Sequence, residues 1–221
     1  MITLALDAST YTGDVAVIVD GQVVAEQSAA MKGADEERLM PAVAHALQTA
    51  NVERKSIDRI VCGAGPGSFT SLRIAGAIAK GMAVGLGKPL YAVPSMALVL
   101  GAANVSPGRY IVTIDALRAE LYIGLYEVDA VHAISELEPA RLIGVGELAR
   151  AAEDFDAKVV SPSRIDNAIV SLPRAGAVTK LEHMLSSAGP VDIDSWEPSY
   201  GRLAEAQVKW ESTHGRPLPA R

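Results

Sequence analysis

The sequence predicts an α/β protein built from two similar lobes. An apolar run of strand length, Ile2 to Leu6, ends in Asp7 and is followed by small and polar residues. The run from Tyr110 to Ile114 ends in Asp115 in the same way, and a second β-rich segment follows each run. A chain of 221 residues is long enough for two lobes of about 100 residues, each with its own core.

The composition is that of a globular protein and narrows the classes of function. A content of 49% hydrophobic and 21% charged residues argues against extensive disorder. The net charge of −6 argues against independent binding of nucleic acid, so we expect any contact with RNA to be shared with a partner. Cys62 is the only cysteine, which excludes a disulfide within the chain. The start does not look like a signal peptide, and the apolar stretch Ile74–Leu86 is shorter than the roughly 20 residues that span a bilayer. We therefore expect a cytoplasmic protein with no membrane contact.

The first lobe, residues 1–105, is expected to open with a three-stranded meander. Its strands are predicted at residues 2–7, 14–19 and 22–28, with Asp20-Gly21 as a two-residue hairpin turn. A helix follows from about Arg38, where apolar residues recur at helical spacing. The remaining elements are predicted to be a strand at Ile57–Gly63, a helix at Ser71–Leu86, a strand at Leu90–Val93 and a helix at Ser95–Ala103.

The second lobe, residues 106–221, begins after a polar segment at 102–108 and repeats this βββαβα order with a weaker pattern. The stretch after residue 128 is polar and loosely patterned as far as Arg141, and the last eight residues are expected to fray. The predicted elements are strands at Tyr110–Asp115, Glu120–Val128 and Lys158–Ser161, and helices at Val145–Phe155, about Val178–Ser186 and about Arg202–Glu211.

A glycine-rich segment, residues 65–70, lies between a predicted strand and a predicted helix. Glycines there permit close approach of the backbone, and the free N–H groups at a helix start attract anions, so Gly65, Gly67 and Ser68 are candidate phosphate ligands. The alternative is a tight turn that needs glycine only for its φ angles. The segment lacks the Gly-Lys-Ser/Thr of a Walker loop and the spacing of a dinucleotide fingerprint.

The two aspartates at the strand ends are candidates for chemistry. Facing each other across a cleft, Asp7 and Asp115 would hold a magnesium ion or orient a water molecule, with Ser9 and Thr10 donating to phosphate oxygens. Taken singly, each aspartate is more often a cap at a strand end or turn, and it is their matched position in the two halves that favours a nucleotide site or its ancestry.

Other catalytic patterns are poorly supported. The four histidines are far apart and include no i,i+4 pair that would hold a metal ion from one helix face. The sequence also has no Gly-x-Ser-x-Gly elbow and no clustered serine, histidine and aspartate typical of a hydrolase triad.

The second predicted helix carries small residues four apart, at Ala77, Gly81 and Gly85. Glycine costs about 1 kcal/mol relative to alanine inside a helix, so close packing is expected to offset it. The contact is predicted to be with the chain's own sheet, with a helix of another subunit, or with both on opposite faces.

Several motifs together resemble the TsaB (YeaZ) family. They are Leu6-Asp-Ala-Ser-Thr10, Gly65-Pro-Gly-Ser-Phe-Thr-Ser-Leu-Arg73, Asp115-Ala-Leu-Arg-Ala-Glu-Leu-Tyr122 and Trp196-Glu-Pro-Ser-Tyr-Gly-Arg202. The resemblance implies an actin-like (ASKHA) fold of two βββαβα lobes. It also implies a non-catalytic, dimerising subunit of the machinery that makes threonylcarbamoyladenosine at position 37 of tRNA.

The resemblance further implies partners. The chain is expected to bind TsaD, the transferase, with TsaE completing the complex, to form a homodimer when alone, and to meet tRNA only through the complex. No cofactor is required by this role, although ATP or ADP with magnesium is an open possibility within the assembled complex. The expected interface lies on the first two helices, at Leu39, Val43, Leu47, Ile74, Ala77, Ile78 and Gly81.

Three residues depart from the family pattern: Ser71 and Ala75 stand where glycine is usual, and Leu117 stands where arginine is common. Two other functions remain open. One is an active actin-like ATPase or small-molecule kinase that uses Asp7 and Asp115. The other is a metalloprotease, against which the missing histidine pair argues.

Overall fold

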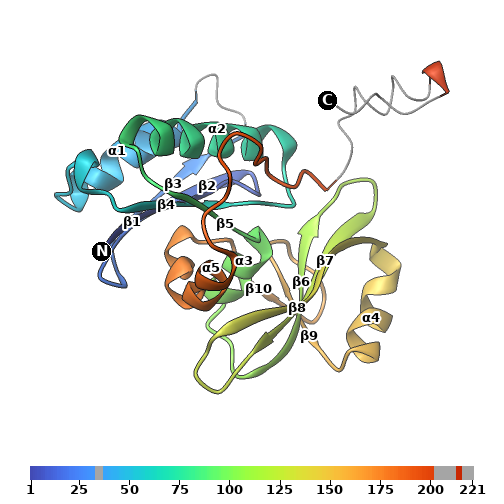
Figure 1. Ribbon diagram of the computed structural model, residues 1–221. Helices are drawn as coiled ribbons and strands as arrows, with labels where there is room; N and C mark the ends of the chain where they lie inside the picture. The colour runs from blue at the N-terminus through green and yellow to red at the C-terminus, as the bar shows by residue number, and fades with distance from the viewer. Residues whose placement is uncertain (33–36, 202–212, 216–221) are drawn as a thin grey trace.

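The computed structural model describes residues 1–32, 37–201 and 213–215, and these form two lobes, each built on a five-stranded sheet (Figure 1). The strand orders are β3-β2-β1-β4-β5 and β8-β7-β6-β9-β10. In each sheet the first three strands pair antiparallel and the last two run parallel to the first. The two sheets therefore share one topology, which confirms the predicted duplication. The strands are β1 (Ile2–Asp7), β2 (Thr12–Val19), β3 (Gln22–Ala30), β4 (Arg59–Gly63), β5 (Leu90–Val93), β6 (Gly108–Asp115), β7 (Glu120–Val128), β8 (Ile134–Gly144), β9 (Lys158–Ser161) and β10 (Ala168–Val170).

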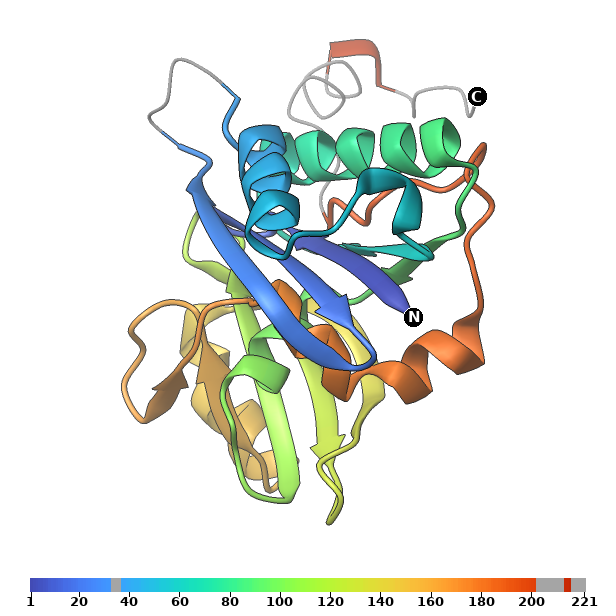
Figure 2. The same ribbon diagram turned by 90° about the vertical axis from the view of Figure 1, so that its left-hand side faces the viewer.

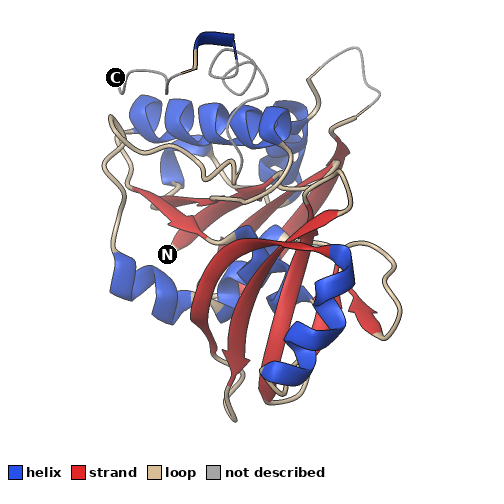
Figure 3. Cartoon of the chain, turned by 90° about the vertical axis from the view of Figure 1, so that its right-hand side faces the viewer, coloured by secondary structure: helices blue, strands red, loops and turns tan. Residues whose placement is uncertain are grey.

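Helices cover the outer faces of both sheets and fill the space between them (Figure 3). The outer face of the first sheet packs against two helices, that of the second sheet against one, and the central core contains residues of a fourth and a fifth helix. The helices are α1 (Leu39–Thr49) and α2 (Phe69–Leu86) on the first sheet, α4 (Leu148–Asp154) on the second, and α3 (Ser95–Ala102) and α5 (Glu182–Ala188) in the centre. Short 3₁₀ helices occur at Arg54–Ser56, Val145–Glu147 and Ala175–Lys180.

The largest hydrophobic core joins the two lobes. Side chains from the inner faces of both sheets meet α3, and Met96, Val99 and Leu100 of that helix are almost fully buried there. Tyr110 and Tyr126 of the second sheet are also buried in this core. Burial of so much apolar surface between the sheets is the main force that holds the lobes together.

The first lobe agrees with its predicted elements to within two residues at most boundaries. Helix α2 is long and apolar enough, by length and composition alone, to cross a membrane. However, its face containing Ala75, Ala79 and Ala83 is buried against the first sheet, as expected for a core helix.

The second lobe differs from its prediction in several places. The polar stretch after residue 128 forms the edge strand β8, which contains Pro139 and several charged residues, a composition typical of sheet edges. Between β9 and β10 the chain has only residues 162–167, where the first lobe has the 18-residue helix α2. The helix predicted at 178–186 divides at Leu181 into a 3₁₀ helix and α5. The helix predicted at about 202–211 lies outside the described residues.

Residues 190–201, here called the strap, run from α5 of the second lobe back across the first lobe to α2 (Figure 2). The amide of Val191 donates to the carbonyl of Leu90 in β5 (2.8 Å), and the amide of Ser199 donates to the carbonyl of Ala64 (2.7 Å). Trp196 packs with the core under α2. The predicted division at residue 105 thus separates the two sheets, but this later segment lies on the first lobe.

Candidate functional site: the cleft between the lobes and the outer face of α2

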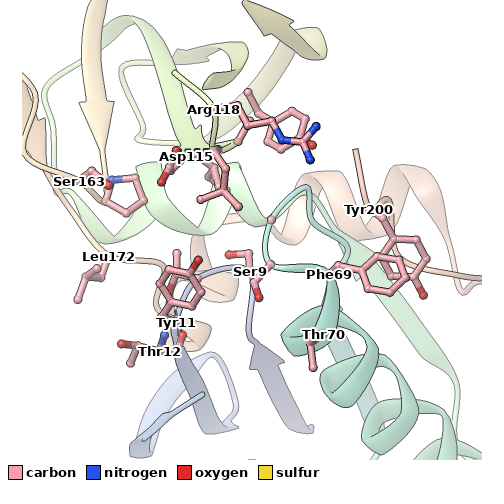
Figure 4. Close-up of a pocket in the computed structure, with 18 residues that line it drawn as sticks. Ser9, Tyr11, Thr12, Phe69, Thr70, Asp115, Arg118, Ser163, Leu172 and Tyr200 are labelled. Carbon is pink, nitrogen blue, oxygen red and sulfur yellow. Dashed lines mark hydrogen bonds between the residues drawn. The ribbon is translucent and has the colours of Figure 1, made fainter. Parts of the chain in front are cut away.

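A cavity of about 870 Å³ lies between the two lobes (Figure 4). The first lobe contributes the turn after β1 and the start of α2, and the second contributes the turn after β6, the segment after β9 and Leu172. The strap contributes Tyr200. The volume lies within the range typical of sites for small ligands, about 300–1,000 Å³. Of the residues predicted to bind nucleotide, Ser9, Thr10, Gly67, Ser68 and Asp115 line this cavity, whereas Asp7 and Gly65 do not.

Asp7 is fully buried behind the cavity. Its Oδ2 accepts hydrogen bonds from the amide (2.9 Å) and hydroxyl (2.8 Å) of Ser9, and its Oδ1 accepts one from the hydroxyl of Ser95 at the start of α3. Burial raises the pKa of the Asp7 carboxyl, and these hydrogen bonds act in the opposite direction. The expectation of two carboxylates facing each other across the cleft is therefore wrong, because Asp7 is enclosed by its own lobe.

The glycine-rich segment is held by close backbone contacts. A Cβ atom at Gly67 would collide with the backbone of Ser9, whose carbonyl accepts a hydrogen bond from the amide of Ser68 (2.8 Å). Gly65 has a φ of +82°, and its Cβ position is occupied by the carbonyl of Ser199 in the strap. Gly65 thus meets the φ requirement of the turn alternative, whereas Gly67 is needed for the close approach of the Ser9 backbone. The Ser68 amide is already bonded within the protein.

The turn after β6 places Asp115 at the edge of the cavity. Leu117, Arg118 and Ala119 are consecutive non-glycine residues with positive φ, between 55° and 62°. The carboxylate of Asp115 accepts the amide of Leu117 (2.9 Å) and so stabilises this left-handed turn. Asp115 is the single acidic side chain among the described residues that line the cavity. Among residues 1–32, 37–201 and 213–215, no group of three histidine, cysteine, aspartate or glutamate residues is arranged to hold a metal ion.

Sequence reasoning missed the aromatic character of the cleft. Tyr11, Phe69, Tyr122 and Tyr200 all line it, and the rings of Phe69 and Tyr200 lie 4.7 Å apart. Burial raises the pKa of the Tyr122 hydroxyl above its ordinary value. The only signal in the sequence for Tyr200 was the motif from Trp196 to Tyr200. Nothing local in the sequence shows that this segment returns to the first lobe and places Tyr200 in the cleft.

The residues predicted to form a partner interface divide into two groups. Leu39, Val43 and Leu47 are buried beneath α1 in the core of the first lobe, so they are not available to a partner. They are apolar because that face of α1 covers the sheet. On α2, Ala77 and Gly81 are exposed, and Ile74 and Ile78 are partly buried at the sides of the same helix.

Comparison with known proteins places the chain in a family. The sequence profile described as "TsaD: tRNA N6-adenosine threonylcarbamoyltransferase" matches residues 23–159, more than half of the chain. The tRNA threonylcarbamoyladenosine biosynthesis protein TsaB of Bacillus subtilis is 27% identical, covering 95% of this chain and 98% of that protein. The structure of YeaZ from Pseudomonas aeruginosa is 25% identical and superposes with a TM-score of 0.73, covering 90% of this chain and 99% of that one. The chain belongs to the TsaB (YeaZ) family. TsaB of Escherichia coli is 33% identical, over 58% of this chain and 56% of that protein.

Membership of the TsaB family agrees with the architecture. The α/β fold with two duplicated lobes is the actin-like (ASKHA) fold that the resemblance to this family implied. Within this TsaB-family fold, the cleft and the outer face of α2 are two surfaces where the described residues leave room for a ligand or a partner.

Proposed function

We propose that this protein acts in the cytoplasm, in tRNA threonylcarbamoyladenosine biosynthesis, as a non-catalytic scaffold that binds TsaD, with TsaE as the third component. Alone, it would pair through the same surface as a homodimer, and it would meet tRNA only through the complex. One structural observation carries the proposal: the small-residue stripe of α2, consisting of Ala77, Gly81 and Gly85, is exposed.

The stripe has no packing partner within the described part of the chain. Cβ atoms added at Gly81 and Gly85 would have no neighbour within 4 Å. The adjacent Val84 is 67% exposed. Each glycine in a helix interior costs about 1 kcal/mol relative to alanine, and no contact with the described residues offsets that cost at Gly81 or Gly85. Close approach of a second helix would account for both glycines and for the exposed valine.

The environment of Asp7 supports a non-catalytic role. Its carboxylate is bonded to Ser9 and Ser95 and is fully buried, so it does not reach a ligand in the cleft. An ATPase or kinase remains the second candidate, because a cavity with Asp115 at its edge does exist between the lobes.

The test compares a substitution on the exposed face of α2 with a matched control substitution on α4 of the second lobe. Ala77→Arg places a charge in the proposed helix contact, whereas Ala149→Arg places the same charge on the exposed face of α4. We expect Ala77→Arg to weaken TsaD binding and self-association by about tenfold or more, since an unpaired charge buried in an interface costs well over 1 kcal/mol. Val43→Arg is unsuitable because it would place the charge in the core.

Binding is measured by co-purification and light scattering, and function by tRNA modification with purified TsaD, TsaE and the chain. Equal complex formation and equal modification with Ala77→Arg and Ala149→Arg would show that the interface lies elsewhere. Sustained ATP hydrolysis by the isolated chain, lost in Asp115→Ala, would favour the enzyme alternative.

A further inference from the structure

We propose that the exposed face of α2 selects a partner helix that carries carboxylates, in preference to a second copy of this chain. Two cations of α2, Arg73 and Lys80, lie beside the small-residue stripe and make this selection. The inference rests on the docking role proposed above and adds to it the chemistry of the partner.

The two helices on the outer face of the first sheet carry no acidic residue. Neither α1 nor α2 contains aspartate or glutamate, whereas α2 contains Arg73 and Lys80. Arg38 directly precedes α1, and Lys88 follows the end of α2. The Glu37 carboxylate, just before α1, accepts amides of the first helical turn. The chain as a whole has a net charge of −6, so this helical layer is a local region of positive charge on an acidic protein. Such a region favours a partner of opposite charge.

Aromatic rings hold both cations in place. The Arg73 guanidinium lies 4.4 Å from the centre of the Phe69 ring and 5.6 Å from the centre of the Tyr200 ring. The Lys80 ammonium lies 6.0 Å from the centre of the Trp196 ring. These contacts restrain the cations without neutralising them. Because the two cations are seven residues apart, they lie two turns apart on one side of the helix, about 10 Å along its axis. The strap, through two of these rings, therefore helps to fix a row of positive charge along the stripe.

The charge of Arg73 is available to a partner. Its side chain is exposed, and none of the ion pairs among the described residues includes Arg73 or Lys80. The pKa of the Asp192 carboxyl in the strap is lowered, chiefly because the Ser195 hydroxyl donates to it (2.6 Å), and the charge of Lys80 adds to this effect. Asp192 thus offsets part of the Lys80 charge. Arg73 is the better site for a partner carboxylate, which its planar guanidinium can bind with two parallel hydrogen bonds.

A second copy of this chain does not supply such a carboxylate from the same helices. A symmetric pair brings the same face of both copies together, so the cations of α2 would meet a face whose two helices have no acidic residue. Like charges placed together at an interface oppose association, and opposite charges favour it. The stripe allows close approach of either helix, so the cations discriminate between them. An RNA partner is less well matched, because small side chains suit helix packing and two cations neutralise few phosphates.

The test measures binding to purified TsaD by calorimetry and self-association by sedimentation, for the wild type, Arg73→Gln and Arg73→Glu. Each is measured at about 0.1 M and about 1 M salt, between which the screening length falls from about 10 Å to about 3 Å. At the lower salt, Arg73→Glu should weaken TsaD binding about tenfold and Arg73→Gln less. The differences should shrink at the higher salt. Self-association should be unchanged or stronger in Arg73→Glu, and that of the wild type should not weaken with salt.

The matched control is Arg150→Glu on α4, which makes the same change of charge where the side chain is 86% exposed. It should leave both equilibria as in the wild type. Because Arg73 is exposed, Arg73→Glu should fold, and its melting temperature checks this. Arg73→Gln keeps a side chain of similar length and tests the loss of charge alone.

Three results would overturn the inference. The first is loss of TsaD binding in Ala77→Arg while Arg73→Glu binds as well as Arg150→Glu, which would leave the docking role in place. The second is a weakening of self-association in Arg73→Glu as large as that of TsaD binding. The third is loss of tRNA binding by the isolated chain in Arg73→Glu with TsaD binding unchanged, which would identify an RNA surface. Unchanged TsaD binding in both Ala77→Arg and Arg73→Glu would instead overturn the docking role itself.

Discussion

Asp7 and Asp115 occupy equivalent positions at the ends of β1 and β6, yet their surroundings differ. Asp7 is enclosed because Gly63, in the neighbouring strand, leaves room for its carboxylate; a Cβ atom there would collide with Oδ1. Ser95 then reaches the same oxygen from the start of α3. Asp115 instead lies exposed at a turn and bonds only with its own local backbone among the contacts described. Asp7 therefore belongs to the buried structure of the first lobe, whereas Asp115 faces the cleft.

The burial of Asp7 predicts a specific pH dependence of stability. Burial raises its pKa above 3.8, so between that value and the raised pKa the folded state binds more protons than the unfolded state. The contribution of Asp7 to the free energy of unfolding should therefore fall as pH rises through this window. We expect the stability of the wild type relative to Asp7→Asn, measured by urea unfolding, to decline over the same range.

The equivalent substitution in the second lobe, Asp115→Asn, is the control for this experiment. An asparagine at this exposed turn still accepts the amide of Leu117, so a change below about 0.5 kcal/mol is expected. A rise in the relative stability of the wild type over Asp7→Asn with pH would mean that the hydrogen bonds from Ser9 and Ser95 outweigh burial.

Helix α2 has two faces with opposite requirements. Gly76 faces the strap, and a Cβ atom there would lie 3.1 Å from Cγ of Pro198. A Cβ atom at Gly81 would have none of the described residues within 4 Å. The first glycine is needed for packing within the chain, whereas the second is not.

The two faces predict different effects of the same substitution. Gly81→Ala should raise the free energy of unfolding of the isolated chain by about 0.5–1 kcal/mol, because alanine is the better helix former and meets no neighbour. Gly76→Ala should raise the free energy of unfolding by less than Gly81→Ala does, or should lower it, because the added methyl group requires Pro198 to move. Chemical denaturation of both variants measures this, and equal effects at the two sites would contradict the assignment of faces.

Polar contacts join the two lobes in addition to their shared core, and the contacts of Asp14 and Glu26 with residues 174–176 are here called the latch. Asp14 of β2 accepts hydrogen bonds from the amide of Ala175 (2.7 Å) and from Nη1 of Arg174 (3.1 Å). Glu26 of β3 accepts the amide of Gly176 (3.0 Å). These contacts tie the first sheet to the start of the 3₁₀ helix that follows β10, so a change in the angle between the lobes would have to break them.

We expect removal of the Glu26 charge to raise the free energy of unfolding in a pH-dependent way. Burial, and then the nearby charge of Asp14, raise the pKa of Glu26 above 4.5, so the ionised form lowers the stability of the folded state. Glu26→Gln retains an acceptor for Gly176 and should raise the free energy of unfolding at pH 8, with the gain disappearing below pH 4.5. Urea unfolding at both pH values measures the effect, with the exposed Glu53→Gln as control. A loss of stability at pH 8 would show that the charge of Glu26 is needed by the latch.

At the scale of the whole molecule, the local elements and their repetition can be predicted from short stretches of sequence. Apolar runs that end in Asp7 and Asp115 located β1 and β6, and the helical spacing after Arg38 located α1. The place of the glycine-rich turn between β4 and α2 was also evident. These features depend on residues close together in the chain, whose backbone preferences and periodicity are visible without a fold.

The tertiary structure alone decided which surfaces are available. Periodicity showed that one face of α1 is apolar, but not that Leu39, Val43 and Leu47 cover the chain's own sheet. The enclosure of Asp7 depends on Ser95, 88 residues away, and the aromatic wall of the cleft depends on the return of Tyr200 along the strap. Burial and charge environment are sums over contacts between segments distant in sequence, so a local pattern cannot specify them.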